Sequence, residues 1–258
     1  MRIIDSHAHY YNDPNYLEAL IEQMDNCGIE KCCLSGLGDL FHCKNNKDVK
    51  DAFEKYPKRI IGSYFIRPGK STASDIETAY ENGFKMLKAT IPTKPYNHKS
   101  FYPLWQKAEE LHLPILFHTG IVTYFDKEGK EDISSWNMHP MRIEPITNAF
   151  PKLNIIIAHL GVHWNKDAAE LIRMRSNIYS DITGEPDGWR THADKVGWKR
   201  LLWWEGAFRK LVFGTDVFEN KIPIILKQDK ERFNKLNIDK TTKELYFSKN
   251  ILKLLGMD

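Results

Sequence analysis

Two histidines, His7 and His9, stand two positions apart just after a short apolar segment near the start of the chain. In extended backbone, side chains two positions apart point to the same side of a strand. Both imidazoles would therefore face one site and could offer two nitrogen ligands to a metal ion. The spacing alone is weak evidence, because ten histidines in 258 residues give on the order of 0.4 such pairs by chance.

Three further ionisable residues stand where apolar runs stop. His118 ends Pro-Ile-Leu-Phe-His, His159 ends Ile-Ile-Ile-Ala-His, and Asp216 follows Leu-Val-Phe-Gly-Thr. Each run has the composition of a buried strand, so these side chains are predicted to follow the carboxyl ends of strands. In a (β/α)₈ barrel those ends converge on one face, where catalytic residues come from several strands.

A set of three imidazoles and one carboxylate suits zinc, or alternatively manganese, iron or cobalt, and leaves a position for water or substrate. Lowering the pKa of bound water from 15.7 to about 7 is worth ~12 kcal/mol at 1.36 kcal/mol per unit. A general base alone contributes roughly 10²- to 10⁴-fold, or ~3–5 kcal/mol. We therefore expect one divalent metal ion, with zinc favoured, to carry the larger share of catalysis.

Short apolar, β-branched runs alternate with segments of helical periodicity, as expected of parallel βα units. The eight predicted strands are 2–4, 31–35, 60–65, 84–89, 114–118, 154–158, 177–181 and 210–214. A first helix is predicted from the apolar stripe of Leu17, Leu20, Ile21 and Met24, with Gly28 as its stop. The other predicted helices are 46–56, 74–82, 101–111, 141–150, 166–174, 193–203, 222–233 and 241–255.

This pattern predicts a distorted TIM (β/α)₈ barrel, a single domain over residues 1–258 with a C-terminal helix. The length is close to the roughly 250 residues of such barrels. An open doubly wound sheet is the alternative, but no G-x-G-x-x-G follows the first strand and no Walker loop is present, so the barrel is favoured. Two long connections, 120–139 and 182–192, leave strand ends and are predicted walls or lids of a pocket.

Bulk composition favours a soluble globular protein. The net charge is only +3, and basic residues are scattered among acidic ones, so nucleic acid is not an expected partner. The longest apolar runs are far shorter than the ~20 residues that cross a bilayer, and the start of the chain is polar. We expect a cytoplasmic protein with a small-molecule substrate and no membrane partner. A homodimer is left open.

The sequence resembles the amidohydrolase-2 group of the amidohydrolase superfamily, which includes aminocarboxymuconate-semialdehyde and resorcylate-type decarboxylases. The resemblance covers nearly the whole chain, and the set of motifs in this order is specific to the family, although no single motif is. The motifs are Ile-Asp-Ser-His-Ala-His, Gly-Phe-Lys-Met-Leu-Lys, Pro-Ile-Leu-Phe-His-Thr-Gly, Ile-Ile-Ile-Ala-His-Leu-Gly, Leu-Val-Phe-Gly-Thr-Asp and the terminal Asn-Ile-Leu-Lys-Leu-Leu-Gly.

The resemblance implies that one metal ion is held by His7, His9, His118 and Asp216. It also implies that His159 is the general acid/base of the reaction. In some superfamily members the counterpart of Asp216 takes a proton as well, so a dual role for this aspartate is left open.

Candidate substrate contacts are Arg67, Lys88 and His163. Some superfamily members carboxylate a lysine on strand four to bridge two metals, but for Lys88 a contact with a substrate carboxylate or an ion pair is favoured. Arg67 follows strand three and is either an anion-binding residue or a surface residue. His163 follows His159 by four positions and could support the site from a loop. The tryptophans at 136, 189, 203 and 204 are interpreted as packing residues.

Three functions fit this set of residues. The first is hydrolysis of an amide, ester or lactone by metal-activated water, with His159 or Asp216 moving the proton. The second is nonoxidative decarboxylation of an aromatic or dienoic acid, in which His159 governs protonation of carbon. The third is a non-catalytic metal-binding barrel. Hydrolysis is favoured because 258 residues is short for decarboxylases of this family.

Overall fold

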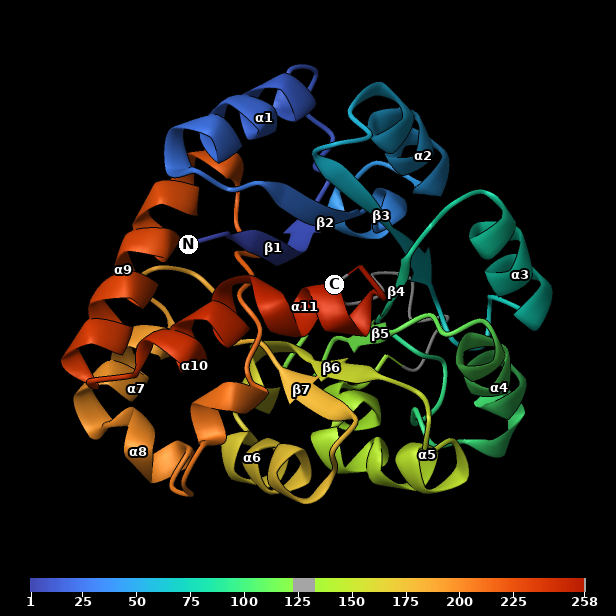
Figure 1. Cartoon of the computed structure of the whole chain (residues 1–258). Coiled ribbons are helices and arrows are strands. Elements are labelled where there is room, and N and C mark those ends of the chain that lie inside the picture. Colours follow the sequence, from blue (N-terminus) through green and yellow to red (C-terminus); the bar gives the residue numbers. More distant parts are fainter. Residues whose placement is uncertain (123–132, 258) are drawn as a thin grey trace. The chain divides into compact units, whose positions relative to one another are not determined.

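The computed structural model describes residues 1–122 and 133–257 (Figure 1). The chain divides into two compact units. Unit 1 consists of Met1–Gly62 and Asp181–Asp258, and unit 2 consists of Ser63–Ser180. In Figure 1, unit 1 is blue and orange to red, whereas unit 2 runs from teal to yellow. The expectation of a single domain over the whole chain stays a prediction.

Among the described residues, seven parallel strands are hydrogen-bonded in chain order. They are β1 (Ile4–His9), β2 (Lys31–Ser35), β3 (Ile60–Ile66), β4 (Met86–Ala89), β5 (Ile115–Phe117), β6 (Ile155–Ile157) and β7 (Ile178–Ser180). Their residues are almost all buried, as in parallel sheets whose strands are covered on both faces. The predicted parallel α/β architecture is confirmed.

In unit 1, strand β1 is paired with β2, and His9 stands opposite Ser35. The helices of this unit are α1 (Tyr16–Cys27), α2 (Asn46–Lys55), α7 (Trp189–Val196), α8 (Trp198–Leu201), α9 (Ile222–Lys235), α10 (Lys240–Glu244) and α11 (Asn250–Leu254). Helix α1 buries Leu17, Leu20 and Met24, and Gly28 ends it with a left-handed φ of 67°. The first predicted helix and its stop are therefore confirmed.

The predicted eighth strand, 210–214, is wrong. Residues 207–210 form a 3₁₀ turn, and the segment after them has no strand ladder. The N–H of Phe213 instead donates to the carbonyl of Tyr246, 2.8 Å away, in a π-helical turn that interrupts the predicted C-terminal helix. The segment still lies against β1, because the N–H and Oγ of Ser6 both donate to the carbonyl of Phe213, at 2.9 and 2.6 Å.

In unit 2, the ends of the strands are aligned. Ala89 of β4 pairs with Phe117 of β5, which pairs with Ile157 of β6, which pairs with Ser180 of β7. The residues that follow these strands therefore emerge at one edge of the sheet. Figure 1 shows the helices of this unit along one face of its strands. They are α3 (Ala73–Glu81), α4 (Tyr102–Glu110), α5 (Glu144–Ala149) and α6 (Asn165–Met174).

The two long connections are only partly loops. In the connection 120–139, residues 123–132 lie outside the described residues, and a 3₁₀ turn occupies Ser135–Met138. The connection 182–192 is shorter than predicted because α7 already begins at Trp189. Within the part of the chain that the structure describes, no helix has the length and apolar character needed to cross a membrane.

Candidate metal centre

Three side chains of unit 1, His7, His9 and Asp216, turn their ligand atoms toward one another. The Nε2 of His9 lies 3.2 Å from the Nε2 of His7 and 3.1 Å from Oδ1 of Asp216. The same Oδ1 lies 3.6 Å from the Nε2 of His7. Both histidines are buried in β1, whereas the Asp216 side chain is 20% exposed. The histidines thus lie on one side of the strand, as their spacing predicts.

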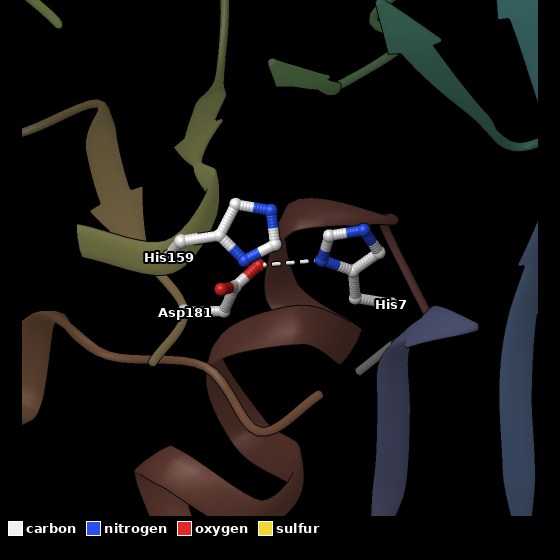
Figure 2. A group of neighbouring side chains, drawn as sticks. All are labelled: His7, His159 and Asp181. Atoms are coloured by element: carbon white, nitrogen blue, oxygen red, sulfur yellow. Dashed lines mark hydrogen bonds and ion pairs between the residues drawn. The ribbon is translucent and has the colours of Figure 1, made fainter. Parts of the chain in front are cut away.

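The other ring nitrogens of these histidines are occupied by hydrogen bonds. The Nδ1 of His7 lies 2.9 Å from Oδ2 of Asp181, and neither side chain is exposed (Figure 2). A carboxylate only accepts, so this Nδ1 carries the hydrogen. The Nδ1 of His9 lies 2.9 Å from Oγ of Ser35, whose own hydroxyl donates to the carbonyl of Ala8 at 3.5 Å. Both Nε2 atoms therefore direct lone pairs toward Asp216.

Three acceptor atoms at this spacing suit a cation. Ligand atoms 2.0–2.2 Å from a tetrahedral ion stand about 3.3–3.6 Å from one another. The three separations here are 3.1, 3.2 and 3.6 Å. Without a cation, the two lone pairs and the carboxylate would repel one another in a buried setting. The donor set of two imidazoles and one carboxylate thus fits a divalent metal ion.

The segment that carries Asp216 approaches β1 closely. A Cβ on Gly214 would lie 2.8 Å from the Cβ of His7 and 2.9 Å from Cγ2 of Thr183, so only glycine fits there. Two residues later, Asp216 has a left-handed φ of 51°, which aspartate tolerates better than most residues do. Its N–H donates to the carbonyl of His7 at 2.7 Å. Glycine and a strained turn thus bring the carboxylate to the histidines.

An aromatic pair stands beside this cluster. The rings of Tyr11 and Phe218 are stacked with centroids 3.9 Å apart, and Tyr11 also meets the edge of His9 at 6.4 Å. Burial raises the pKa of the Tyr11 hydroxyl, and the negative charge of Asp216 raises it further. Tyr11 therefore stays protonated and can only donate or accept as a neutral phenol. Sequence reasoning did not single out either ring.

In unit 2, the histidine predicted as a metal ligand, His118, lies next to the predicted acid/base, His159. His118 directly follows β5, and its Nδ1 lies 3.2 Å from the Nε2 of His159. The backbones beside them are tied as well, because the hydroxyl of Thr119 donates to the carbonyl of Ala158 at 2.7 Å. One of the two ring nitrogens therefore donates its hydrogen to the other.

The backbone at His159 is unusual. His159 and Leu160 both have left-handed conformations, with φ of 59° and 45°, in a 3₁₀ turn that begins right after β6. Both residues are buried, at 7% and 0% exposure. Left-handed conformations at residues other than glycine are costly and tend to occur at functional sites. This turn directs the imidazole of His159 away from the strand direction and toward His118.

The amidohydrolase family model matches residues 40–257 of the chain. The chain belongs to the amidohydrolase family. The matched region contains His118, His159 and Asp216, and it begins after β1, so the match does not rest on His7 and His9. The family consists of enzymes, as the sequence analysis expected. A comparison with curated proteins found no match.

Solved structures resemble the amidohydrolase over its whole length. An uncharacterized TIM-barrel protein from Bordetella bronchiseptica is 19% identical with a TM-score of 0.74, covering 100% of this chain and 99% of that one. A probable 2-pyrone-4,6-dicarboxylic acid hydrolase from Acinetobacter baumannii with citric acid bound is 15% identical, with a TM-score of 0.68 and coverages of 99% and 100%. A 5-carboxyvanillate decarboxylase from Novosphingobium aromaticivorans, complexed with manganese and a nitrobenzoic acid, is 16% identical, with a TM-score of 0.65 and coverages of 99% and 96%. At these identities the likeness shows the fold, which is of the TIM-barrel type.

The three predicted substrate contacts of the amidohydrolase all belong to unit 2. Lys88 is 1% exposed within β4. Arg67 is half-buried, and its Nε donates to the carbonyl of Ile91 at 3.0 Å. His163 is exposed. The roles of these residues stay predictions.

Sequence reasoning missed two residues that support the histidines of the amidohydrolase, Asp181 and Ser35. Asp181 directly follows the last residue of β7, so it stands at a strand end, as Asp216 was expected to. Ser35 is the last residue of β2 and carries no such signal, because serine is common at strand ends. Its role depends on the pairing of His9 with Ser35 across two strands.

Proposed function

We propose that this amidohydrolase is a metal-dependent hydrolase that cleaves an amide, ester or lactone bond of a small molecule. One divalent ion, with zinc favoured, would be held by His7, His9, His118 and Asp216. The observation that carries the proposal is the convergence of two imidazole lone pairs and a carboxylate oxygen within 3.1–3.6 Å in unit 1. The TIM-barrel type of fold supports it, since strand ends converge in such barrels.

When bound, the ion would supply a Lewis acid and lower the pKa of a water molecule. The residues of the chain would then bind, orient and exchange protons. Asp216 exposes one edge of its carboxylate, which can accept a proton from an attacking water molecule. His159 would deliver a proton to the leaving group, with the hydrogen bond to His118 holding its ring in place.

Decarboxylation of a small carboxylic acid is the alternative. The manganese-containing decarboxylase with a similar fold favours it, as does the need of that reaction for a cation that grips the carboxylate. Arg67 offers a cation, and its Nε donates to the carbonyl of Ile91 at 3.0 Å. A panel of lactones, amides and hydroxybenzoates, assayed for acid release and for carbon dioxide, decides between the two reactions.

Replacement of the two histidines of unit 2 should separate metal binding from proton transfer. Purified protein is expected to contain about one equivalent of metal per chain, and His118→Ala should lose most of it. His159→Asn should retain the metal and lower turnover by roughly 10²- to 10⁴-fold, the usual contribution of a positioned acid/base. Elemental analysis measures the metal content. Turnover is measured with the substrate that the panel identifies.

His98→Asn is the matched control, because His98 is an exposed histidine of unit 2 whose Nδ1 contacts the Oγ and the N–H of Ser100. It should change neither metal content nor turnover. Metal-free wild-type protein with full activity would refute the proposed function. Loss of metal in His159→Asn would make that residue a ligand instead.

Asp181→Asn should weaken metal binding without removing a ligand. The carboxylate of Asp181 holds the Nδ1–H of His7 and is itself fixed by the N–H and hydroxyl of Thr183, at 3.1 and 2.7 Å. An amide can present its N–H₂ to His7, which favours the other tautomer and removes the lone pair from Nε2. We expect metal affinity to fall 10- to 100-fold, the usual effect of losing such a partner.

Isothermal titration of metal-free protein with Zn²⁺ measures this effect. Asp187→Asn, an exposed aspartate six positions along the same connection, is the control and should bind Zn²⁺ as the wild type does. Equal affinities of Asp181→Asn and the wild type would show that the tautomer of His7 is fixed by other contacts.

A further inference from the structure

A second buried carboxylate, that of Asp5, holds both segments that carry the candidate ligands of unit 1. Its Oδ1 accepts the N–H of His7 and the N–H of Thr215, each at 3.0 Å. Its Oδ2 accepts the hydroxyl of Thr215 at 2.6 Å. Asp5 is 1% exposed and Thr215 is fully buried. One side chain thus joins the backbone of β1 to the residue directly before Asp216.

The hydrogen bonds between Asp5 and Thr215 lie next to Asp216, whose backbone conformation is unusual. The left-handed conformation of Asp216, with φ of 51°, is unfavourable for a residue with a Cβ and persists only if its surroundings impose it. The N–H groups of Thr215 and Asp216 both reach the carbonyl of His7, at 3.3 and 2.7 Å, and the shorter contact belongs to Asp216. The closer partner of the Thr215 N–H is the carboxylate of Asp5, at 3.0 Å.

We propose that Asp5 and Thr215 form a clamp that positions Asp216 for metal binding. The proposal rests on the proposed function, because it assigns these residues a task toward the same metal centre. Neither residue points a ligand atom at the centre, so both are positioning residues. The clamp fixes where Oδ1 of Asp216 stands relative to the Nε2 atoms of His7 and His9, now 3.6 and 3.1 Å away.

The chain contains a matched control for this clamp. On α10, Asp239 accepts the N–H of Thr242 at 2.9 Å and its hydroxyl at 2.6 Å, almost the same distances as in the pair of Asp5 and Thr215. That pair caps a short helix and touches none of the candidate ligands. Removal of the hydroxyl therefore breaks the same kind of hydrogen bond in both variants, but only one variant loosens the ligand segment.

The test compares Thr215→Val with Thr242→Val in the full chain, with Co²⁺ as the probe. Titration of metal-free protein gives the affinity, and the visible absorption of bound Co²⁺ reports its coordination geometry. We expect Thr215→Val to bind Co²⁺ 10- to 100-fold more weakly and with an altered spectrum. Thr242→Val and the conservative Thr215→Ser, which retains the hydroxyl, should match the wild type in both measurements.

The outcomes separate the clamp from the proposed function. Wild-type protein that binds no Co²⁺ refutes the proposed function and the clamp together. Wild-type binding with the same affinity and spectrum in Thr215→Val overturns the clamp alone. A lower melting temperature with an unchanged Co²⁺ spectrum would also overturn it, because Thr215 would then serve only the fold. If Thr215→Val does not fold, Thr215→Ala removes the same hydroxyl with the same expected results.

Discussion

Asp216→Asn is expected to lower turnover by at least about 10⁴-fold, because it removes a metal ligand and a proton acceptor together. A loss of about 5.4 kcal/mol of transition-state stabilisation corresponds to this factor at 1.36 kcal/mol per tenfold change. Asparagine has nearly the same size and also tolerates the left-handed backbone found at this position. The substitution therefore tests the charge of the side chain while it preserves the turn.

Removal of the metal by a chelator provides the reference for this variant. Wild-type protein treated with a chelator should fall to a similar activity and recover when Zn²⁺ or Mn²⁺ is added back. Asp216→Asn should not recover under the same conditions. Substantial activity in Asp216→Asn at saturating metal would contradict both proposed roles of this aspartate.

Asp229→Ala is expected to cost the most stability, roughly 3–5 kcal/mol, because it leaves the buried guanidinium of Arg190 without its counter-ion. Asp229 is fully buried in α9 and accepts hydrogen bonds from the guanidinium groups of Arg190 and Arg232 and, at 2.6 Å, from the hydroxyl of Tyr246. Arg232 also binds Asp194 at 2.7 and 2.9 Å. Among the described residues, Nε and Nη1 of Arg190 have no hydrogen-bond partner. Asp229 is therefore the main group that balances the charge of this buried guanidinium.

A loss of this size should lower the melting temperature by about 10 °C for a chain of this length. Glu30→Ala is the control, since the ion pair of Glu30 with Arg2 is exposed and such pairs are worth less than about 1 kcal/mol. Combined replacement of Arg190 and Arg232 by Met, Asp229 by Leu and Tyr246 by Phe should restore most of the stability. A melting temperature unchanged in Asp229→Ala would show that the two arginines find water or other partners.

Most of the architecture was predictable because strands buried on both faces are continuous apolar runs. The run of Ile155–Ile157 and the run of Lys31–Ser35 illustrate this, since their bounds in the structure agree with the predicted ones to within a residue. The helix predicted over 193–203 was less accurate. It begins at Trp189 and is interrupted at Gly197, whose positive φ of 98° ends one helix before the next begins.

The eighth strand could not be excluded from the sequence, because Leu-Val-Phe has the composition of a strand. The surrounding structure prevents a strand. The backbone carbonyl of Tyr246 accepts the N–H of Phe213, and the side chain of Asp5 accepts the N–H of Thr215. A strand ladder needs main-chain partners on a neighbouring strand, whereas these two N–H groups bind a carbonyl of a helical turn and a side-chain carboxylate. No local pattern encodes such a replacement.

The candidate site was predictable where it depends on position along a strand, and not where it depends on contacts across strands. The spacing of His7 and His9 was sufficient to place both rings on one side of β1. The support of these rings by Asp181 and Ser35 depends on residues distant in sequence, so it required coordinates. Whether His118 and His159 join the histidines of unit 1 around one ion stays a prediction.

The hydrogen bonds between Asp5 and Thr215 connect residues 210 positions apart in the sequence. During synthesis, His7 and His9 leave the ribosome early, but Asp216 follows only after most of the chain has been made. Two imidazoles on one strand without the carboxylate form an incomplete site, and a metal site is rarely present before the fold that builds it. Under the proposed function, metal uptake would therefore be a late event in the biogenesis of this protein.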